Sequence, residues 1–262
     1  MIIKVIRQIA AILERFIALF LFLALWEILP RVGVIDPFFL PPLSTVISTI
    51  VKMIQTGELS QHLLASLRRT LTGFILGFAF AVTMGLIIGW FSRVERFADI
   101  LLQSFRQTSA LALFPIFILF FGIGEMSKAA IIFWGVQWPI LLNTISGVKN
   151  IDPLLIKSAR SMGASQWTIF RKVVFPASLP SIFTGTRLSA TSAVLLLIAA
   201  EMVGAKAGLG YMMFEAQQNF QIPRMYAAIL IMSIIGFTAN YLLVHLENKY
   251  SMWKEKPNTI DS

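Results

Sequence analysis

The sequence has no cysteine and only two histidines, His62 and His245. Without cysteine the chain has no disulfide, no thiolate nucleophile and no cysteine-ligated zinc or iron–sulfur cluster. The two histidines are too few and too far apart in the sequence to indicate a metal site, so we expect no metal. Charged residues are also scarce, at 13% of the 262 residues, which is about half of their usual share in a soluble domain.

Hydrophobic residues make up 57% of the chain, and its mean hydropathy is +0.78. Intrinsic disorder is excluded, because disordered segments combine low hydrophobicity with high net charge. A membrane-spanning helix needs about 20 mostly apolar residues, and six stretches of the sequence are apolar enough. We therefore expect an all-α integral membrane protein with about six transmembrane helices. The predicted spans cover residues 12–29, 71–91, 110–121, 129–148, 189–203 and 225–246, the third extended backward through Phe105.

The length predicts a single transmembrane domain without a further large soluble domain. We expect four parts: residues 1–40 for the first span and an outer turn, 41–69 for an outer amphipathic segment, 70–246 for a five-span core and 247–262 for a tail. A signal peptide is the alternative for the first apolar stretch. It is disfavoured because no small-x-small cleavage motif follows Pro30.

The net charge of +9 indicates a membrane orientation rather than a nucleic-acid partner, because Lys and Arg collect in cytoplasmic loops. With the N-terminus inside and six alternating spans, fifteen of the 22 Lys and Arg residues fall on the inner side. This distribution predicts that both termini are cytoplasmic. Arg68 and Arg69 fit it least, since both lie on the outer side beside the second span.

Residues 41–69 are predicted to form two short helices outside the bilayer. Pro41 and Pro42 followed by Ser44 are typical of a turn and a helix N-cap. Apolar residues then recur at helical spacing, at Val46, Ile47, Ile50, Val51 and Ile54. We expect an amphipathic helix along the outer interface that ends at Gly57, and a second short helix over residues 60–69 that leads into the second span.

The second span carries a small residue at every fourth position. These residues are Gly73, Gly77, Ala81, Gly85 and Gly89. Such a row lets another helix approach closely in lipid, so helix packing is the favoured interpretation and a lining of the transport path is the alternative. Pro115 and Pro139 predict kinks in the third and fourth spans.

The inner segment of residues 149–187 is the most informative part of the sequence. Asp152 and Pro153 are typical of a helix N-cap and of the first helical residue, and Gly163 is typical of a helix end. The first helix has a small apolar face, made of Leu154, Leu155, Ser158, Ala159 and Met162.

A second short helix is predicted after this glycine, over residues 166–173, with Ser165 as its N-cap. Pro176 and Pro180 are expected to close the unit. The pattern indicates either a helix pair that lies on the membrane surface or a docking element for a cytoplasmic partner.

This segment resembles a loop of the binding-protein-dependent ABC importers, whose permease subunits carry Glu-Ala-Ala-x3-Gly-x9-Ile-x-Leu-Pro. The chain has Lys157-Ser158-Ala159, Gly163 and Phe175-Pro176 at the matching spacing, with Lys157 in place of the Glu. In that family the loop seats in a cleft of the ATPase subunit. The resemblance implies that coupling residues include Asp152, Lys157, Ser158, Ala159, Gly163, Ala164, Phe170 and Pro176.

Further segments resemble the subfamily that serves nitrate, sulfonates, taurine and bicarbonate. They are Phe114-Pro115 and residues 121–128, 139–144, 182–185, 200–202 and 208–211. The resemblance implies a type I ABC importer permease for a small solute, such as one of these anions. It also implies a homodimer, two ATPase subunits that bind ATP and magnesium, an extracytoplasmic solute-binding protein and the bacterial inner membrane.

The chain has no Gly-x4-Gly-Lys-Ser/Thr phosphate loop and no nucleophile–base arrangement, so we expect that it is no enzyme and binds no cofactor itself. An ion-coupled secondary transporter without an ATPase partner is the alternative. Such a transporter keeps ionisable residues inside the membrane, and Glu201, near the outer end of the fifth span, is the one candidate.

Hydrogen-bonding side chains in the spans are candidates for the solute pathway, because neutral donors bind an anion weakly and release it easily. The candidates are Gln107, Trp134, Gln137, Trp138, Asn143, Thr191, Ser192 and Glu201. Bonds between neighbouring helices are the alternative role for these residues. Glu201 is expected near the outer gate or the contact with the binding protein, where its charge can repel an anion backward or pair with a lysine such as Lys206.

Overall fold

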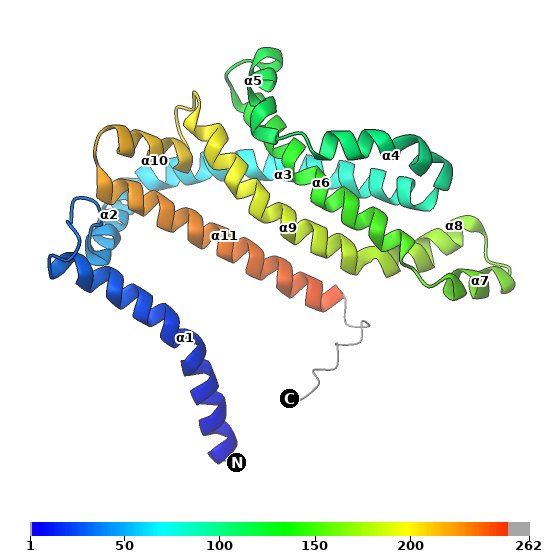
Figure 1. Cartoon of the computed structure of the whole chain (residues 1–262), viewed down its shortest axis with the longest axis horizontal. Coiled ribbons are helices and arrows are strands. Elements are labelled where there is room, and N and C mark those ends of the chain that lie inside the picture. Colours follow the sequence, from blue (N-terminus) through cyan, green and yellow to red (C-terminus); the bar gives the residue numbers. More distant parts are fainter. Residues whose placement is uncertain (1, 251–262) are drawn as a thin grey trace. The chain divides into compact units, whose positions relative to one another are not determined.

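The computed structural model describes residues 2–250, with side chains for residues 17–249, and every regular element in this range is helical (Figure 1). The helices are α1 (Ile2–Arg31), α2 (Leu43–Gln55), α3 (Glu58–Trp90), α4 (Ser92–Arg106), α5 (Ala110–Phe121), α6 (Glu125–Lys149), α7 (Pro153–Ser161), α8 (Gln166–Ile169), the π-helical turn η1 (Phe170–Val174), α9 (Phe175–Met202), α10 (Leu209–Gln218) and α11 (Ile222–Tyr250). The chain forms two compact units. One comprises the residues up to Leu63 with Met212–Ile231, and the other comprises Leu64–Tyr211 with the residues from Met232 on.

Four stretches of the described chain are long and apolar enough to cross a membrane: Glu58–Trp90, Glu125–Lys149, Gln166–Met202 and Ile222–Lys249. They contain the predicted second, fourth, fifth and sixth spans. The predicted first span lies in α1, whose side chains up to residue 16 are outside the described part, so it stays a prediction. Residues 247–250 of the predicted tail belong to α11, and the rest of the tail lies outside the described residues.

The predicted third span is not one straight helix. Taken together, α4 and α5 are long and apolar enough for one membrane span, but the two helices meet at an angle of 95°. Gln107 ends α4, and Ser109 has an extended backbone before α5 begins. The backward extension through Phe105 was therefore wrong, because the polar run Gln107-Thr108-Ser109 interrupts the helix.

Two predicted helix boundaries were also wrong. The predicted short helix over residues 60–69 is the first part of α3, because no glycine or proline interrupts that helix before residue 73. The helix that contains the predicted fifth span, α9, begins at Phe175, 14 positions before residue 189. Pro176 lies in the first turn of α9 and the helical structure continues on both sides of it, so it does not close the loop.

In the first unit, α2 begins before the predicted cap. Ser44 lies inside α2, and Pro42 occupies the N-cap position without a side-chain cap. The carboxylate of Glu27 in α1 supplies the missing acceptor: it accepts a bond from Ser44 N at 2.9 Å and another from Ser44 Oγ at 2.9 Å. Gly57, at φ +76°, ends α2 as predicted.

In the second unit, the small residues of α3 pack against α6. A Cβ at Gly73 would lie 2.7 Å from Ile132 Cβ, and a Cβ at Gly85 would lie 2.6 Å from Thr144 Cβ. Gly77 and Gly89 make the same kind of approach to Val136 and Val148. The contacting residues are spaced by multiples of four positions on both helices. The row of small residues in α3 therefore serves helix packing, which was the favoured interpretation of the sequence.

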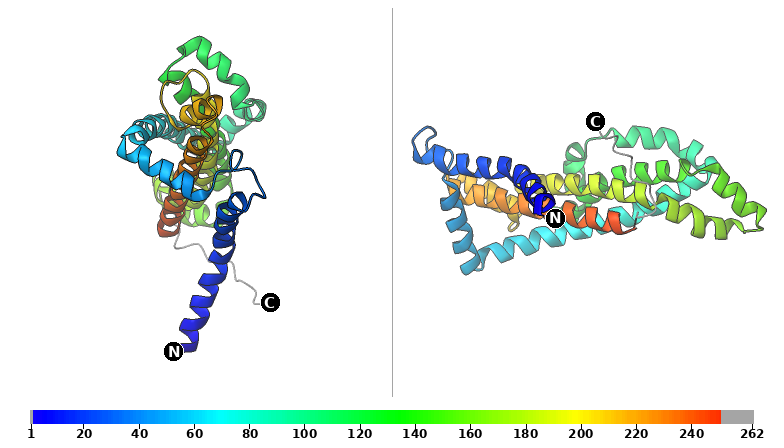
Figure 2. Two further views of the ribbon diagram at one scale, coloured as in Figure 1. Left: turned by 90° about the vertical axis from the view of Figure 1, so that its left-hand side faces the viewer. Right: turned by 90° about the horizontal axis from the view of Figure 1, so that it is seen from below.

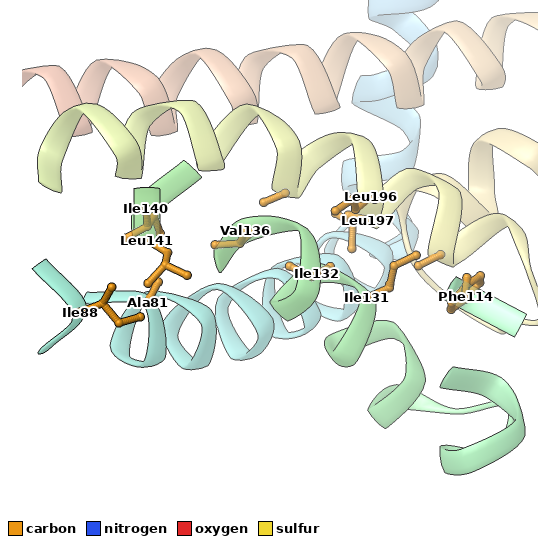
Figure 3. Close-up of a cluster of buried hydrophobic side chains, with 12 residues drawn as sticks. Ala81, Ile88, Phe114, Ile131, Ile132, Val136, Ile140, Leu141, Leu196 and Leu197 are labelled. Carbon is orange, nitrogen blue, oxygen red and sulfur yellow. The ribbon is translucent and has the colours of Figure 1, made fainter. Parts of the chain in front are cut away.

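The core of this unit lies where α3, α5, α6 and α9 meet. Figure 3 shows Ala81 and Ile88 of α3 and Leu196 and Leu197 of α9 around the α6 side chains. α6 and α9 run alongside each other, as the views in Figure 2 show. Gly185 of α9 makes this possible, because a Cβ there would lie 2.7 Å from the carbonyl oxygen of Pro139. Pro115 and Pro139 both lie within helices, α5 and α6.

Candidate functional site

The loop after α6 has the capping contacts that the sequence predicts. Asp152 Oδ1 accepts a hydrogen bond from Leu154 N at 2.8 Å at the start of α7. Ser165 Oγ accepts one from Thr168 N at 3.2 Å at the start of α8. Between the two helices Gly163 has φ +76°, a backbone conformation that favours glycine. Local residue chemistry therefore positions α7 and α8 around a fixed bend.

The second loop helix does not stop before the fifth span, which corrects the prediction for residues 166–173. α8 passes into η1, and η1 passes directly into α9. The π-helical turn ends just before Phe175-Pro176, where the proline has no N–H for a bond to the carbonyl four residues back. Gln166–Met202 is thus one continuous helical rod that joins the loop to the membrane core.

The predicted apolar face of α7 divides in two. Ala159 is buried and packs in a cluster with Ile169 of α8 and Val174 of η1. Leu154, Leu155 and Met162 are exposed, at 65%, 52% and 80% of their surface. Three large apolar side chains of this loop are thus left uncovered by the rest of the described chain.

The remaining loop candidates surround this surface. Lys157 and Ser158 are exposed on α7, and Lys157 forms no ion pair within the described residues. Ala164, Phe170 and Pro176 are half-buried. The loop candidates thus form one continuous segment with an exposed apolar and basic outer side.

Three of the pathway candidates come together at a pocket of about 390 Å³. Trp134 and Trp138 of α6 and Ser192 of α9 line it, and Arg106 and the segment that joins α4 to α5 complete it. The two indole rings lie 5.4 Å apart between centroids, in an edge-on arrangement. Neither indole Nε1 has a hydrogen-bond acceptor in the described part of the chain, although both atoms are buried. The hydroxyl of Ser192, by contrast, donates to the carbonyl oxygen of Leu188 at 3.5 Å.

The other pathway candidates do not line this pocket. Gln107 is exposed where α4 ends, Thr191 is exposed on α9, and Gln137 is buried. Asn143 Nδ2 donates to the carbonyl oxygen of Pro139 at 2.8 Å, so its amide is engaged within its own helix.

Glu201 has different surroundings from those expected. Its side chain is fully buried, and its Oε1 lies 2.7 Å from Nη1 of Arg69 rather than beside Lys206. Ser66 Oγ donates to it at 2.8 Å, and Gly210 N donates at 2.8 Å. The pairing with Lys206 was wrong because the buried carboxylate faces α3 and the turn before α10.

Arg69 is the centre of this network, which the sequence reasoning missed. It also binds Glu125 of α6 at 2.6 Å and the carbonyl oxygen of Ala207 at 2.6 Å. The network joins α3, α6, α9 and the segment before α10. A signal was available: an arginine at the edge of an apolar span needs a partner, and Glu125 and Glu201 are acidic residues beside other spans.

Comparisons with known proteins agree with this architecture. Residues 73–252 match the family model described as "Binding-protein-dependent transport system inner membrane component". The chain is 35% identical over 232 residues to the putative aliphatic sulfonates transport permease protein SsuC of Bacillus subtilis, which covers 88% of this chain and 84% of that protein. It is 30% identical over 236 residues to the taurine transport system permease protein TauC of Escherichia coli, and the match covers 88% of this chain and 86% of that protein.

Among solved structures, the inward-facing MetNI methionine ABC transporter has the same fold. The match has a TM-score of 0.61 at 19% identity and covers 71% of this chain and 93% of that one. The chain belongs to the family of binding-protein-dependent transport system inner membrane components, as a membrane-spanning permease subunit of an ABC importer.

Proposed function

We propose that this permease forms the translocation pathway for a small organic or inorganic anion, with sulfonates and taurine as the first candidates and nitrate and bicarbonate as further ones. The observation that carries the proposal is the continuous rod Gln166–Met202. One end of the rod belongs to the exposed loop surface, and Ser192, ten residues before the other end, lines the pocket of Trp134 and Trp138.

This rod can transmit movement over a long distance. Trp167 and Ser192 are 25 positions apart in the sequence, which corresponds to about 40 Å of helix. A displacement of α7 and α8 by a docked ATPase would shift the α9 wall of the pocket. Alternating access then follows from closure of the ATPases on ATP binding and their release after hydrolysis.

The chemistry of the pocket suits an anion. Arg106 supplies a positive charge, and the hydroxyls of Ser109 and Ser192 in the lining can take part in hydrogen bonds. Sulfonate, nitrate and bicarbonate accept several such bonds around one charge. The relatives named for aliphatic sulfonates and taurine support this class of solute.

The proposed assembly has two copies of the permease, two ATPase subunits and a solute-binding protein that delivers the anion from outside. Both termini and the loop of residues 149–187 face the cytoplasm in this arrangement. Lys157 and Arg160 are exposed beside the apolar side chains of α7 and would contact acidic groups of the ATPase.

Reconstitution tests the proposal. Proteoliposomes that contain the permease with its ATPase, supplied with binding protein and ATP, are expected to accumulate labelled taurine or an alkanesulfonate. The permease alone is expected to accumulate none. Uptake by the permease alone under a proton or sodium gradient would contradict the proposal and favour the ion-coupled transporter.

A further inference from the structure

A second pocket, of about 590 Å³, is lined in part by the coupling loop, residues 149–187, and shares no lining residue with the pocket of Trp134 and Trp138. Its walls come from the last turns of α3 and from the segment α8–η1. Thr83, Trp90 and Phe91 stand on one side, and Trp167 and Phe170 on the other. The lining is almost entirely apolar, so water is a poor occupant.

The aromatic side chains form the rim of this pocket. The Phe170 ring stacks on Trp167 at 5.8 Å and meets Trp90 edge-on at 6.0 Å between centroids. Trp167 is 69% exposed and Phe91 is 53% exposed. Tryptophan at such a position is typical of a membrane–water interface, where the ring is half in the acyl region and half among headgroups.

Basic residues lie close to lining residues of this pocket in the sequence. Arg171 and Lys172 directly follow Phe170 in the sequence, and Arg93 lies two positions after Phe91. All three are exposed, and none forms an ion pair among residues 17–249. Residues 83–94 and 166–176 contain no Asp or Glu, and the next acidic residue, Glu95, pairs with Lys149. The two segments that line the pocket therefore carry a net positive charge.

We propose that this pocket binds an anionic phospholipid, with an acyl chain between Trp90 and Trp167 and the headgroup phosphate at Arg171, Lys172 and Arg93. The occupant follows from charge complementarity, because an apolar cavity with a basic rim matches the two ends of such a lipid. The proposal rests on the proposed function in one respect: the pocket shares α8 and η1 with the coupling loop, so it faces the cytoplasm only if that loop does.

Binding at this place has a consequence for transport. The lipid would contact the first turns of the rod Gln166–Met202, the part that a docked ATPase must move. An anionic phospholipid would thus stabilise one position of α8, and the lipid composition would set how strongly ATP hydrolysis is coupled to uptake.

Lipid retention by the full chain tests the proposal. The chain is purified, delipidated and titrated with phosphatidylglycerol or with phosphatidylcholine of identical acyl chains, and bound lipid is counted by native mass spectrometry. We expect at least one phosphatidylglycerol to bind about tenfold tighter than phosphatidylcholine, as two or three nearby basic residues suggest. Arg171→Gln with Lys172→Gln is expected to abolish this preference.

Two further variants separate the pocket from general surface charge. Thr83→Phe places a ring in the pocket from an exposed position and is expected to weaken binding of both lipids. Lys52→Gln with Lys206→Gln removes two exposed basic residues elsewhere and is expected to leave the preference unchanged.

Equal affinity for both lipids, or a preference that survives loss of Arg171 and Lys172, would overturn the proposal. Release of bound phosphatidylglycerol when the ATPase subunits are added would assign the pocket to the protein interface and overturn it as well. Retention is measured without any transport step. A failure of the lipid site and a failure of ATP-driven uptake are therefore observed separately.

Discussion

At the scale of single residues, the buried network around Arg69 gives the charge of Glu201 a structural role. Glu201 has no exposed surface and four hydrogen-bonding contacts, from Ser66, Arg69 and Gly210. Gly208 must be a glycine here, because a Cβ would lie 2.3 Å from Glu201 Oε1. An intramembrane carboxylate is a candidate for ion coupling only while it can exchange ions. Glu201 is instead held between helices, and this removes the main sequence argument for a secondary transporter.

Loss of Arg69 is expected to destabilise the protein strongly. Arg69→Met leaves Glu201 buried without its charged partner, a change that typically costs about 3–5 kcal/mol. The thermal unfolding midpoint of the purified chain in detergent should fall, and Arg69→Met with Glu201→Leu should recover part of the loss. Lys206→Gln is the control and should unfold like the wild type. A wild-type midpoint for Arg69→Met would show that the ion pair does not stabilise the fold.

At the scale of elements, the features that depend on neighbouring residues were predictable and those that depend on tertiary packing were not. The caps at Asp152 and Ser165 and the bend at Gly163 are confirmed, because each involves residues within a few positions. The continuation of α8 through η1 into α9 was missed. Proline occurs both in the first turn of a helix and just after a helix end, so Pro176 alone does not tell the two apart. The break at Gln107–Ser109 was missed because its residues do not exclude a helix.

The same limit applies to the candidate site. The sequence placed Trp134, Trp138 and Ser192 in one group, and the structure puts them around one pocket. It could not show that Asn143 bonds to its own helix or that Glu201 faces Arg69. Both facts depend on which side of a helix meets a neighbour, and polar residues in a span have no periodic signal for this.

The bend at Gly163 is expected to be required for coupling. Gly163→Val places a β-branched residue at φ +76°, a strained conformation that shifts α7 relative to α8. In the reconstituted transporter, ATP-driven uptake should fall by roughly tenfold or more while ATP hydrolysis by the assembly persists. Asn adopts the left-handed region far more readily, so Gly163→Asn should keep most of the uptake. Equal uptake by the valine variant and the wild type would contradict a role for the bend.

The close approach of α3 and α6 gives a stability prediction. In Gly85→Val the new Cβ would lie 2.6 Å from Thr144 Cβ and 3.1 Å from the Leu141 carbonyl oxygen, so the helices must separate. Overpacking of this kind costs about 1–3 kcal/mol and should lower the thermal midpoint. Gly236→Ala is the matched control, because its nearest atom is 4.0 Å away and alanine favours a helix. If both variants unfolded at the same temperature, α3 and α6 would not be packed as described.

At the scale of the whole molecule, one rod connects the two surfaces that we propose to act in transport. The exposed apolar side chains of α7 lie at the loop, and the pocket with Arg106, Trp134 and Trp138 lies against α9. Transport requires that this pocket change its access when the loop is displaced. A pocket that never changes its access would be only a binding site. The decisive measurement is therefore the access of solvent to the pocket in two nucleotide states of the transporter.

The last prediction uses the absence of native cysteine in all 262 residues, which lets a single introduced thiol report its own exposure. Ser192→Cys and Trp138→Cys in the assembled transporter should react with a water-soluble thiol reagent from outside in one nucleotide state and more slowly in the other. Ser189→Cys is the control on the same helix, because Ser189 is fully buried and donates to the Val136 carbonyl oxygen at 2.6 Å. It should not react in either state. If the thiols at positions 138 and 192 stay unreactive in both the nucleotide-free and the ATP-trapped states, the pocket lies outside the pathway. Equal reactivity in both states would mean that the α9 rod does not move the pocket wall.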